Sequence, residues 1–144
     1  MSEQEIKMTD KELRYIALFS TITGADVVDC VETDNYLVFV VSKGHLTKAL
    51  GKGGSKTKNL ANLFKKRIKI IEYSDDVVEF VTNALRPVRV EEVKLAQRDD
   101  GKVIVVARVH PEEKGKTIGK GGKNITALKA IINRHHRLDS IIIE

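Results

Sequence analysis

The sequence contains the same glycine-rich segment twice, and this duplication constrains the fold more than any other feature. Residues 50–54 read Leu-Gly-Lys-Gly-Gly, and residues 118–122, 68 positions further on, read Ile-Gly-Lys-Gly-Gly. Glycine has no Cβ and adopts positive φ angles freely, so such a segment favours a sharp turn that can approach a bulky ligand closely. One glycine-rich turn is a weak signal, but its repetition predicts an internal duplication.

The sequence around the two segments repeats as well. Residues 36–41 and 104–109 are apolar and rich in valine, which predicts a buried strand in each copy. A short helix, the glycine turn, a longer helix and a closing strand follow; the closing strands are expected at 67–73 and 138–143. The apolar residues of the longer helices recur at helical spacing. They are Leu60, Leu63 and Phe64 in the first copy and Ile125, Leu128, Ile131 and Ile132 in the second.

Each copy also begins with a helix and a strand. Thr9 and Glu12 have the spacing of a capping box, which predicts that the first helix starts at Thr9, and Gly24 is suited to end it. Residues 27–32 are expected to form a hairpin with residues 36–41. The predicted buried face of the first helix comprises Leu13, Tyr15, Ile16, Leu18, Phe19 and Ile22.

The second copy follows the first after a very short connection. Residues 77–85 carry one apolar stripe and stop before Pro87, which predicts a helix. Strands are expected at residues 88–97 and 102–109, joined by a turn that ends in Asp-Gly. Pro111 is suited to start the next helix, in which Gly115 is unfavourable. The sequence therefore predicts an α+β protein of two domains, residues 1–73 and 74–144, each α-β-β-α-α-β, with a loose N-terminus at 1–8.

The basic residues are concentrated around the glycine segments. From Lys43 to Lys69 there are nine Lys or Arg and no Asp or Glu; from Lys102 to Arg137 there are nine basic residues and two acids. A basic run is usually only a solvated face. Its coincidence with both glycine turns favours a surface that binds phosphates, since unpaired amides at a helix start also attract anions.

Composition and motif searches exclude several classes of protein. Cys30 is the only cysteine, so no internal disulfide can form and a reducing compartment is expected. Residues 1–10 are polar, and no stretch approaches the ~20 apolar residues of a membrane span. The nucleotide-binding phosphate loop motif does not occur, and the histidines lack partners at metal-ligand spacing. We therefore expect a cytoplasmic protein with no membrane association, no catalytic residues, no cofactor and no metal.

The duplicated order of elements and the Gly-x-x-Gly turns resemble tandem KH (K-homology) domains. The extra helix and strand precede the core of each copy, as in the type II variant. Two such copies, both with Gly-Lys-Gly-Gly, are similar to the NusA-like transcription factors and to their short archaeal form. The resemblance covers residues 10–144 and implies a three-stranded mixed sheet in each domain with helices on one face. It also implies single-stranded RNA as partner, a role in transcription elongation or termination, RNA polymerase as a candidate partner, and a monomer.

The same resemblance implies the RNA contacts. The ends of the family motif match Gly51, Gly54, Gly119 and Gly122, and its middle matches Lys52, Gly53, Lys120 and Gly121. The glycines and the amides after them are expected to contact the RNA backbone, and the two lysines its phosphates. Plausible flanking contacts are Lys56, Lys58, Lys116, Lys123 and Asn124. Leu50 and Ile118 are either floor residues of a groove for bases or core residues.

Two other interpretations stay open at this point. Type II KH folds also serve in ribosome assembly and translation, so an RNA-binding factor of that kind is one alternative. The other is a nucleotide-binding enzyme that uses the glycine turns as phosphate cradles. An acidic side chain for Mg²⁺ near either turn would favour the enzyme, and none lies near the first.

Overall fold

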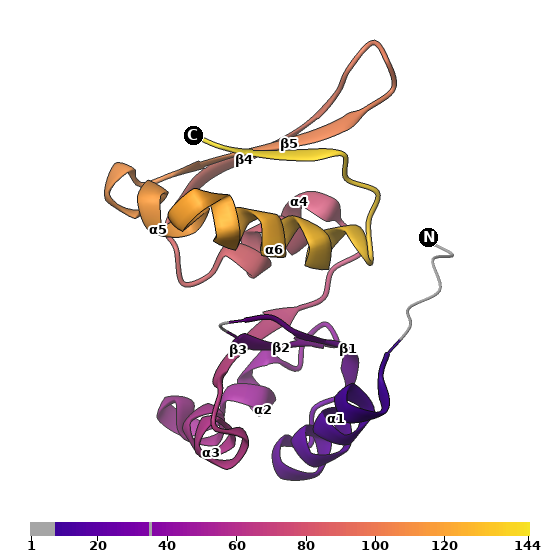
Figure 1. Cartoon of the computed structure of the whole chain (residues 1–144), viewed down its shortest axis with the longest axis vertical. Helices are drawn as coiled ribbons and strands as arrows, with labels where there is room; N and C mark the ends of the chain where they lie inside the picture. Colours follow the sequence, from indigo (N-terminus) through magenta and orange to yellow (C-terminus); the bar gives the residue numbers. More distant parts are fainter. Residues whose placement is uncertain (1–7, 35) are drawn as a thin grey trace. The chain divides into compact units, whose positions relative to one another are not determined.

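In the computed structural model, which describes residues 8–34 and 36–144, the chain divides between Ser74 and Asp75. Both parts, here the first and second units, have the element order predicted from the repeat (Figure 1). The first unit contains α1 (Asp10–Thr23), β1 (Val27–Glu32), β2 (Tyr36–Val41), α2 (Leu46–Leu50), the 3-10 turn η1 (Lys52–Gly54), α3 (Ser55–Phe64) and β3 (Arg67–Glu72). Apart from Met8, the predicted loose N-terminus lies outside the described residues.

The second unit repeats this order with small additions. It contains α4 (Val77–Leu85), β4 (Val90–Gln97), β5 (Val103–Val109), the 3-10 turn η2 (Pro111–Glu113), α5 (Lys114–Ile118), the 3-10 turn η3 (Lys120–Gly122), α6 (Lys123–Asn133) and β6 (Ser140–Ile143). The short helix α5 forms despite Gly115. It starts later than expected because Pro111 opens a separate turn, closed by the Glu113 N–H donating to His110 O at 2.9 Å.

Each unit is built on a three-stranded mixed sheet. In the first, β2 lies in the centre, antiparallel to β1 and parallel to β3. In the second, β5 takes the same place between β4 and β6. The helices of each unit lie on one face of its sheet (Figure 1). This confirms the α+β class and the adjacent parallel pair of strands on either side of each helix–turn–helix.

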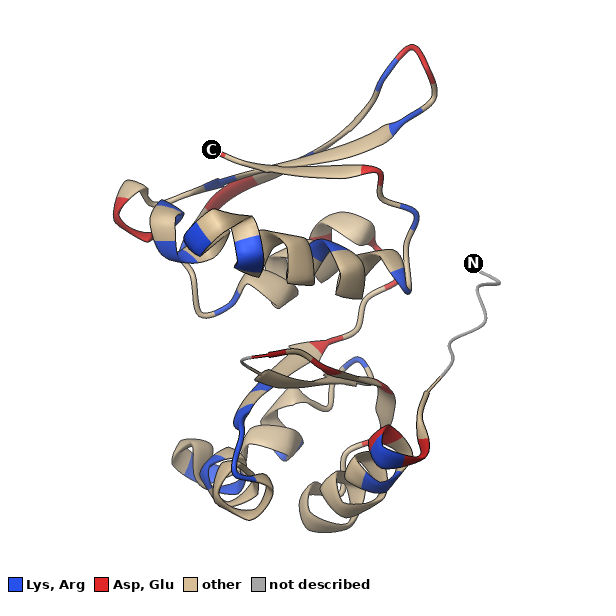
Figure 2. Cartoon of the chain, in the orientation of Figure 1, with Lys and Arg blue, Asp and Glu red and all other residues tan. Residues whose placement is uncertain are grey.

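Charged residues of the first unit are segregated by element. The charged residues from α2 to Ile71 are all Lys or Arg, whereas the described acids before α2 lie between Asp10 and Asp34 (Figure 2). The fold therefore presents one basic segment, which contains the glycine turn.

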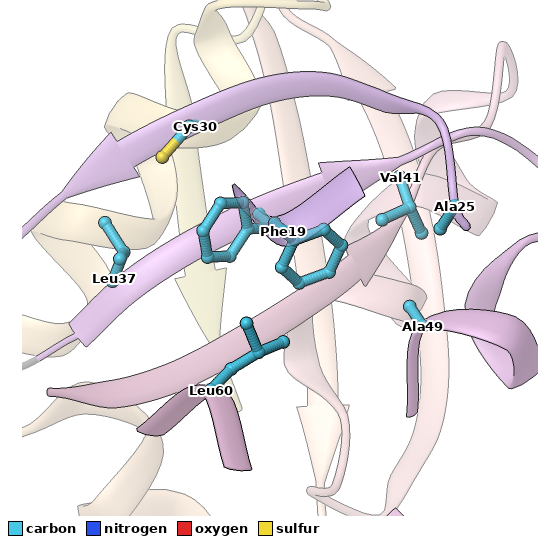
Figure 3. Packing of buried hydrophobic residues seen from close by; sticks show 8 residues of the cluster. Phe19, Ala25, Cys30, Leu37, Val41, Ala49 and Leu60 are labelled. Atoms are coloured by element: carbon cyan, nitrogen blue, oxygen red, sulfur yellow. The ribbon is translucent and has the colours of Figure 1, made fainter. Parts of the chain in front are cut away.

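The core of the first unit forms where α1, α2 and α3 pack on the sheet. Alternate residues of β2 point to one face of a sheet, so Leu37, Phe39 and Val41 all face the helices. Phe39 stacks on Phe19 of α1 with ring centroids 4.1 Å apart. Burying a side chain of this size stabilises the fold by roughly 2–3 kcal/mol. The cluster shown in Figure 3 comprises Phe19, Ala25, Cys30, Leu37, Phe39, Val41, Ala49 and Leu60.

Helix α1 has the predicted ends but a narrower buried face than predicted. The Thr9 side chain accepts from the Glu12 N–H, Glu12 reaches back to the Thr9 N–H, and Gly24 ends the helix at φ 75°. The prediction was wrong for Leu13, Leu18 and Ile22, which are 52%, 47% and 39% exposed. Successive helical residues are 100° apart, which places Leu13 about 120° and Leu18 about 100° from the buried Phe19, on opposite sides of it, so neither side chain faces the sheet.

Three further expectations are corrected, one by the packing of α3 and two by local hydrogen bonds. Leu63 of α3 is 56% exposed, because the Leu60 and Phe64 side of the helix faces the core. Strand β4 starts at Val90, two residues late, because the Val88 N–H donates to Leu85 O at 2.9 Å and so belongs to the turn after α4. Leu138 precedes β6, since its N–H donates to Asn133 Oδ1 at 3.0 Å.

Among the described residues, we find no helix whose length and apolar character would let it cross a membrane.

Candidate nucleic-acid interface

The two glycine turns have nearly identical backbones. Gly51 has φ 73° and ψ 174°, and Gly119 has φ 78° and ψ 168°, a region that essentially only glycine occupies. The third and fourth residues of each turn are left-handed, with φ between 63° and 76°. Because three of the four residues need positive φ, the Gly-x-Gly-Gly pattern is dictated by the backbone itself.

Hydrogen bonds close each turn between its two helices. The Gly54 N–H donates to Gly51 O at 3.2 Å, and in the second unit the Gly122 N–H donates to Gly119 O at 3.1 Å. The helices that follow, α3 and α6, begin immediately after these bonds, and no side chain caps their N-termini. The Ser55 and Lys123 N–H groups donate to Lys52 O and Lys120 O. Because no side chain caps the first turns of these helices, their positive ends are suited to an anion.

The first glycine of each turn is packed tightly against its own unit. A Cβ at Gly51 would lie 2.6 Å from Lys56 Cγ, and a Cβ at Gly119 would lie 2.9 Å from the backbone nitrogen of Asn124. At Gly53 and Gly121 a Cβ would meet nothing within 4 Å. Each turn thus has a side fixed to the protein and a side open to a ligand.

Lys56 and Asn124, predicted as flanking RNA contacts, hold the helix–turn–helix together. They occupy the same repeat position. Lys56 Nζ donates to Lys48 O at 3.3 Å, and Asn124 Nδ2 donates to the equivalent Lys116 O at 2.8 Å. Lys56 also donates to Thr23 O at 3.2 Å. The sequence does not reveal this positioning role, because lysine and asparagine share only an N–H donor. Both side chains are long enough for that donor to reach the carbonyl oxygen of the preceding short helix.

The predicted contact lysines lie around the open sides of the turns. Lys52 and Lys120 occupy the second position of each turn and are exposed. No residue in the described part of the chain forms an ion pair with either of them. Lys58, Lys116 and Lys123 are also exposed on the adjoining helices. The structure therefore brings these predicted side chains to the surface next to each turn.

The residues before the turns differ between the units. Leu50 is 37% exposed, so it is a surface residue rather than a core residue. Ile118 is half-buried. An exposed leucine next to the first turn is compatible with an apolar contact to a ligand.

The histidines have structural partners. His45 Nδ1 accepts from the Asp26 N–H at 3.0 Å, and His110 Nδ1 accepts from the Glu112 N–H at 3.3 Å. His135 is buried with its ring edge against Phe80, 5.6 Å between centroids. Within residues 8–34 and 36–144 no three His, Cys, Asp or Glu side chains are grouped so that they could hold a metal ion.

Comparison with known proteins gives consistent matches. The family model of the NusA-like second KH domain matches residues 77–142. A protein of Methanococcus vannielii named probable transcription termination protein NusA is 38% identical over 90% of this chain and 74% of its own length. Proteins of the same name from Halobacterium salinarum and Thermoplasma acidophilum are 35% and 31% identical, covering 94% and 100% of this chain and 96% and 99% of theirs.

Solved structures agree with these matches. The crystal structure of APE1850 superposes with a TM-score of 0.74 at 34% identity, over 95% of this chain and 100% of that one. Since identity above 30% extends over nearly the whole of this chain and most of its relatives, the chain belongs to the NusA-like family of KH-domain proteins.

Proposed function

We propose that this protein is an RNA-binding transcription factor of the NusA type that grips single-stranded RNA through its two Gly-Lys-Gly-Gly turns. The observation that carries the proposal is the duplicated turn. Both copies have the same glycine-only backbone, stand before an uncapped helix and are open on one side. A ligand that suits two such sites carries repeated phosphates and tolerates close backbone approach, which describes a nucleic acid strand.

We assign the units to two tandem type II KH domains, residues 1–73 and 74–144. The element order of each unit supports the assignment, because the additional helix and strand stand before the strand–helix–turn–helix–strand core. A KH turn clamps the backbone of about four nucleotides. Two turns would then hold on the order of eight nucleotides.

We assign a different contact with RNA to each group of residues at the turns. Amides at the start of α3 and α6 are assigned to phosphate oxygens, together with Lys52 and Lys120. Gly53 and Gly121 are assigned to close contact with the RNA backbone, since nothing within 4 Å occupies the space that a Cβ would take there. Lys58, Lys116 and Lys123 supply flanking charge. Lys56 and Asn124 position the turns.

The names of the relatives support a place in transcription termination or elongation. On this proposal the factor is not an enzyme, functions in the cytoplasm as a monomer, and has RNA polymerase as a candidate partner. A nucleotide-binding enzyme is less well supported, because no Asp or Glu occurs between Lys43 and Ile71 to hold the Mg²⁺ that such chemistry uses.

RNA binding should depend steeply on salt. Each phosphate neutralised on a single strand contributes a slope of about −0.7 to log K against log salt, so four to six contacts give roughly −3 to −4. Fluorescence anisotropy with a single-stranded RNA of about 12 nucleotides, titrated at several salt concentrations, measures this slope. A slope near zero would contradict the proposal, because the basic residues would then be solvated rather than bound to phosphates.

A further inference from the structure

The first unit carries exposed basic side chains well beyond its glycine turn. Lys58 lies on α3, Lys65 ends that helix, and Arg67 starts β3; all three are exposed, and we refer to them as the α3 basic face. Figure 2 shows basic residues on α3 and on the segment that leaves it, with no acid among them. This surface starts within two turns of Lys52.

Helical geometry places Lys58, the first residue of the α3 basic face, opposite the core. Leu60 is buried and Phe64 packs against the core cluster, so one side of α3 faces the sheet. Lys58 is 160° away from Leu60 in a regular helix and points outward. Lys65 comes seven residues later, two turns or about 10 Å further along the axis. The charges thus follow α3 away from the turn.

These cations are not neutralised by the protein. No described residue forms an ion pair with Lys58, Lys65 or Arg67. Their neighbour Lys66 behaves differently, because its Nζ lies 2.6 Å from Glu32 Oε2. That hydrogen bond holds the pKa of the Glu32 carboxyl below its usual value. Lys66 is therefore a structural residue, and the other three are available to an anion.

The backbone of Lys65 is strained for a residue with a Cβ. It has φ 54° and ψ 40°, and among the described residues it alone is a non-glycine residue with positive φ. Helices that end in this conformation favour glycine or asparagine there, since a Cβ strains it. An exposed lysine at a strained position needs a reason outside the fold, and strain of this kind tends to mark functional sites.

The second unit has no lysine at two of the corresponding positions. Thr126 and Asn133 stand at the positions equivalent to Lys58 and Lys65. Asn133 keeps a helical backbone, and its Oδ1 accepts from the Leu138 N–H. The additional charge therefore belongs to the first unit rather than to the repeat as such.

We propose that the α3 basic face binds the phosphate backbone of RNA that continues past the first glycine turn. The inference rests on the proposed function and deepens it: the first unit holds a longer RNA segment than the second. Lysine and arginine at this surface contact phosphates as charges and do not read base edges, so the additional contact is independent of sequence. It adds affinity only for RNA longer than the nucleotides clamped at the turns.

The test compares short and long RNA on a face variant, Lys65→Asn and Arg67→Gln, which leaves Lys58 next to the turn unchanged. Affinity for single strands of about four nucleotides should match that of the unchanged protein. Affinity for strands of about 16 nucleotides should fall several-fold at low salt, and the salt slope should become shallower by about 1.4, or 0.7 for each of two contacts. An unchanged slope and affinity for the long strand would overturn the inference.

A control variant removes the same charge elsewhere: Lys94→Gln and Lys102→Gln, both exposed. It should bind both strands within about twofold of the unchanged protein, because screened charges away from a binding site contribute little. Equal losses in the two variants would show a general effect of net charge and overturn the inference. If the unchanged protein bound neither the short nor the long RNA, the proposed function itself would fail. That result differs from the two outcomes that overturn only the inference about the α3 basic face.

The variant Lys65→Gly should change stability and RNA affinity in opposite directions. Glycine relieves the left-handed strain, so the thermal midpoint should rise, whereas affinity for the long strand should fall several-fold because one phosphate contact is lost. Thermal unfolding and anisotropy on the same sample measure both. A higher midpoint with unchanged affinity for the long strand would remove Lys65 from the RNA surface and contradict the inference.

Discussion

Aspartate pairs in place of Lys52-Gly53 and Lys120-Gly121 should abolish RNA binding while the fold stays intact. Each turn would lose one positive charge and gain two negative ones at the surface assigned to phosphates. The fold should tolerate the change, since a Cβ at Gly53 or Gly121 meets nothing within 4 Å. The φ angles of 63° and 65° at these glycines lie in the left-handed region that aspartate adopts more readily than most residues.

Anisotropy titrations and circular dichroism on the same samples measure this result. Changing one turn alone should weaken binding on the order of 100-fold, the effect of about 3 kcal/mol. The matched control is Gly101→Asp with Lys102→Asp, a glycine–lysine pair with the same change of charge on the β4–β5 turn, where Gly101 also has positive φ and open space. Equal losses in the control and the turn variants would contradict the assignment of the turns.

Gly119→Ala should cost the protein about 3–4 kcal/mol of unfolding free energy. Its φ 78° and ψ 168° are strained for any residue with a Cβ, at roughly 1–3 kcal/mol. The added methyl would also lie 2.9 Å from the Asn124 backbone nitrogen, so the turn or α6 must shift, at about 1–3 kcal/mol more. Gly51→Ala should cost a similar amount, because its methyl would lie 2.6 Å from Cγ of Lys56, a side chain that its hydrogen bonds to Lys48 O and Thr23 O hold in place.

Chemical denaturation of the unchanged protein, Gly119→Ala and Gly51→Ala measures these losses of unfolding free energy. Gly121→Ala serves as the control. Gly121 also has positive φ, but a methyl there meets nothing, so only the left-handed strain of about 1–2 kcal/mol applies. Equal destabilisation at Gly119 and Gly121 would mean that the close approach of Asn124 to the first glycine does not contribute to stability.

The order of elements could be predicted because it is encoded locally and repeated. The capping box at Thr9, the left-handed Gly24 and the apolar run of β2 each specify one element without reference to the rest of the chain. The duplication then allowed a clear element in one copy to identify its counterpart. The family followed from the same pattern.

The details that were not predicted depend on tertiary contacts. Leu13, Leu18 and Ile22 have the hydrophobicity of core residues, yet only one side of α1 can reach the sheet. The start of β6 depends on the Asn133 side chain, which bonds to Leu138 across a turn. Neither feature has a local sequence signal.

In the candidate site, too, locally encoded features could be predicted and features that depend on tertiary contacts could not. The positive φ angles of the turns follow from glycine itself, so the open side of each turn could be anticipated. The positioning role of Lys56 and Asn124 could not, because it depends on the distance to carbonyl groups at Lys48 and Lys116, eight residues earlier in the chain. A flanking lysine that binds RNA and one that holds a helix look alike in a sequence.

The most direct test of the central claim is an NMR titration of the ¹⁵N-labelled protein with single-stranded RNA of about 12 nucleotides. We expect the largest amide shift changes at residues 52–55 and 120–123, in both units, because phosphates would bind next to these N–H groups. The same titration on the aspartate variants should leave those amides unchanged. Large shift changes elsewhere, with both glycine turns unaffected, would contradict the account.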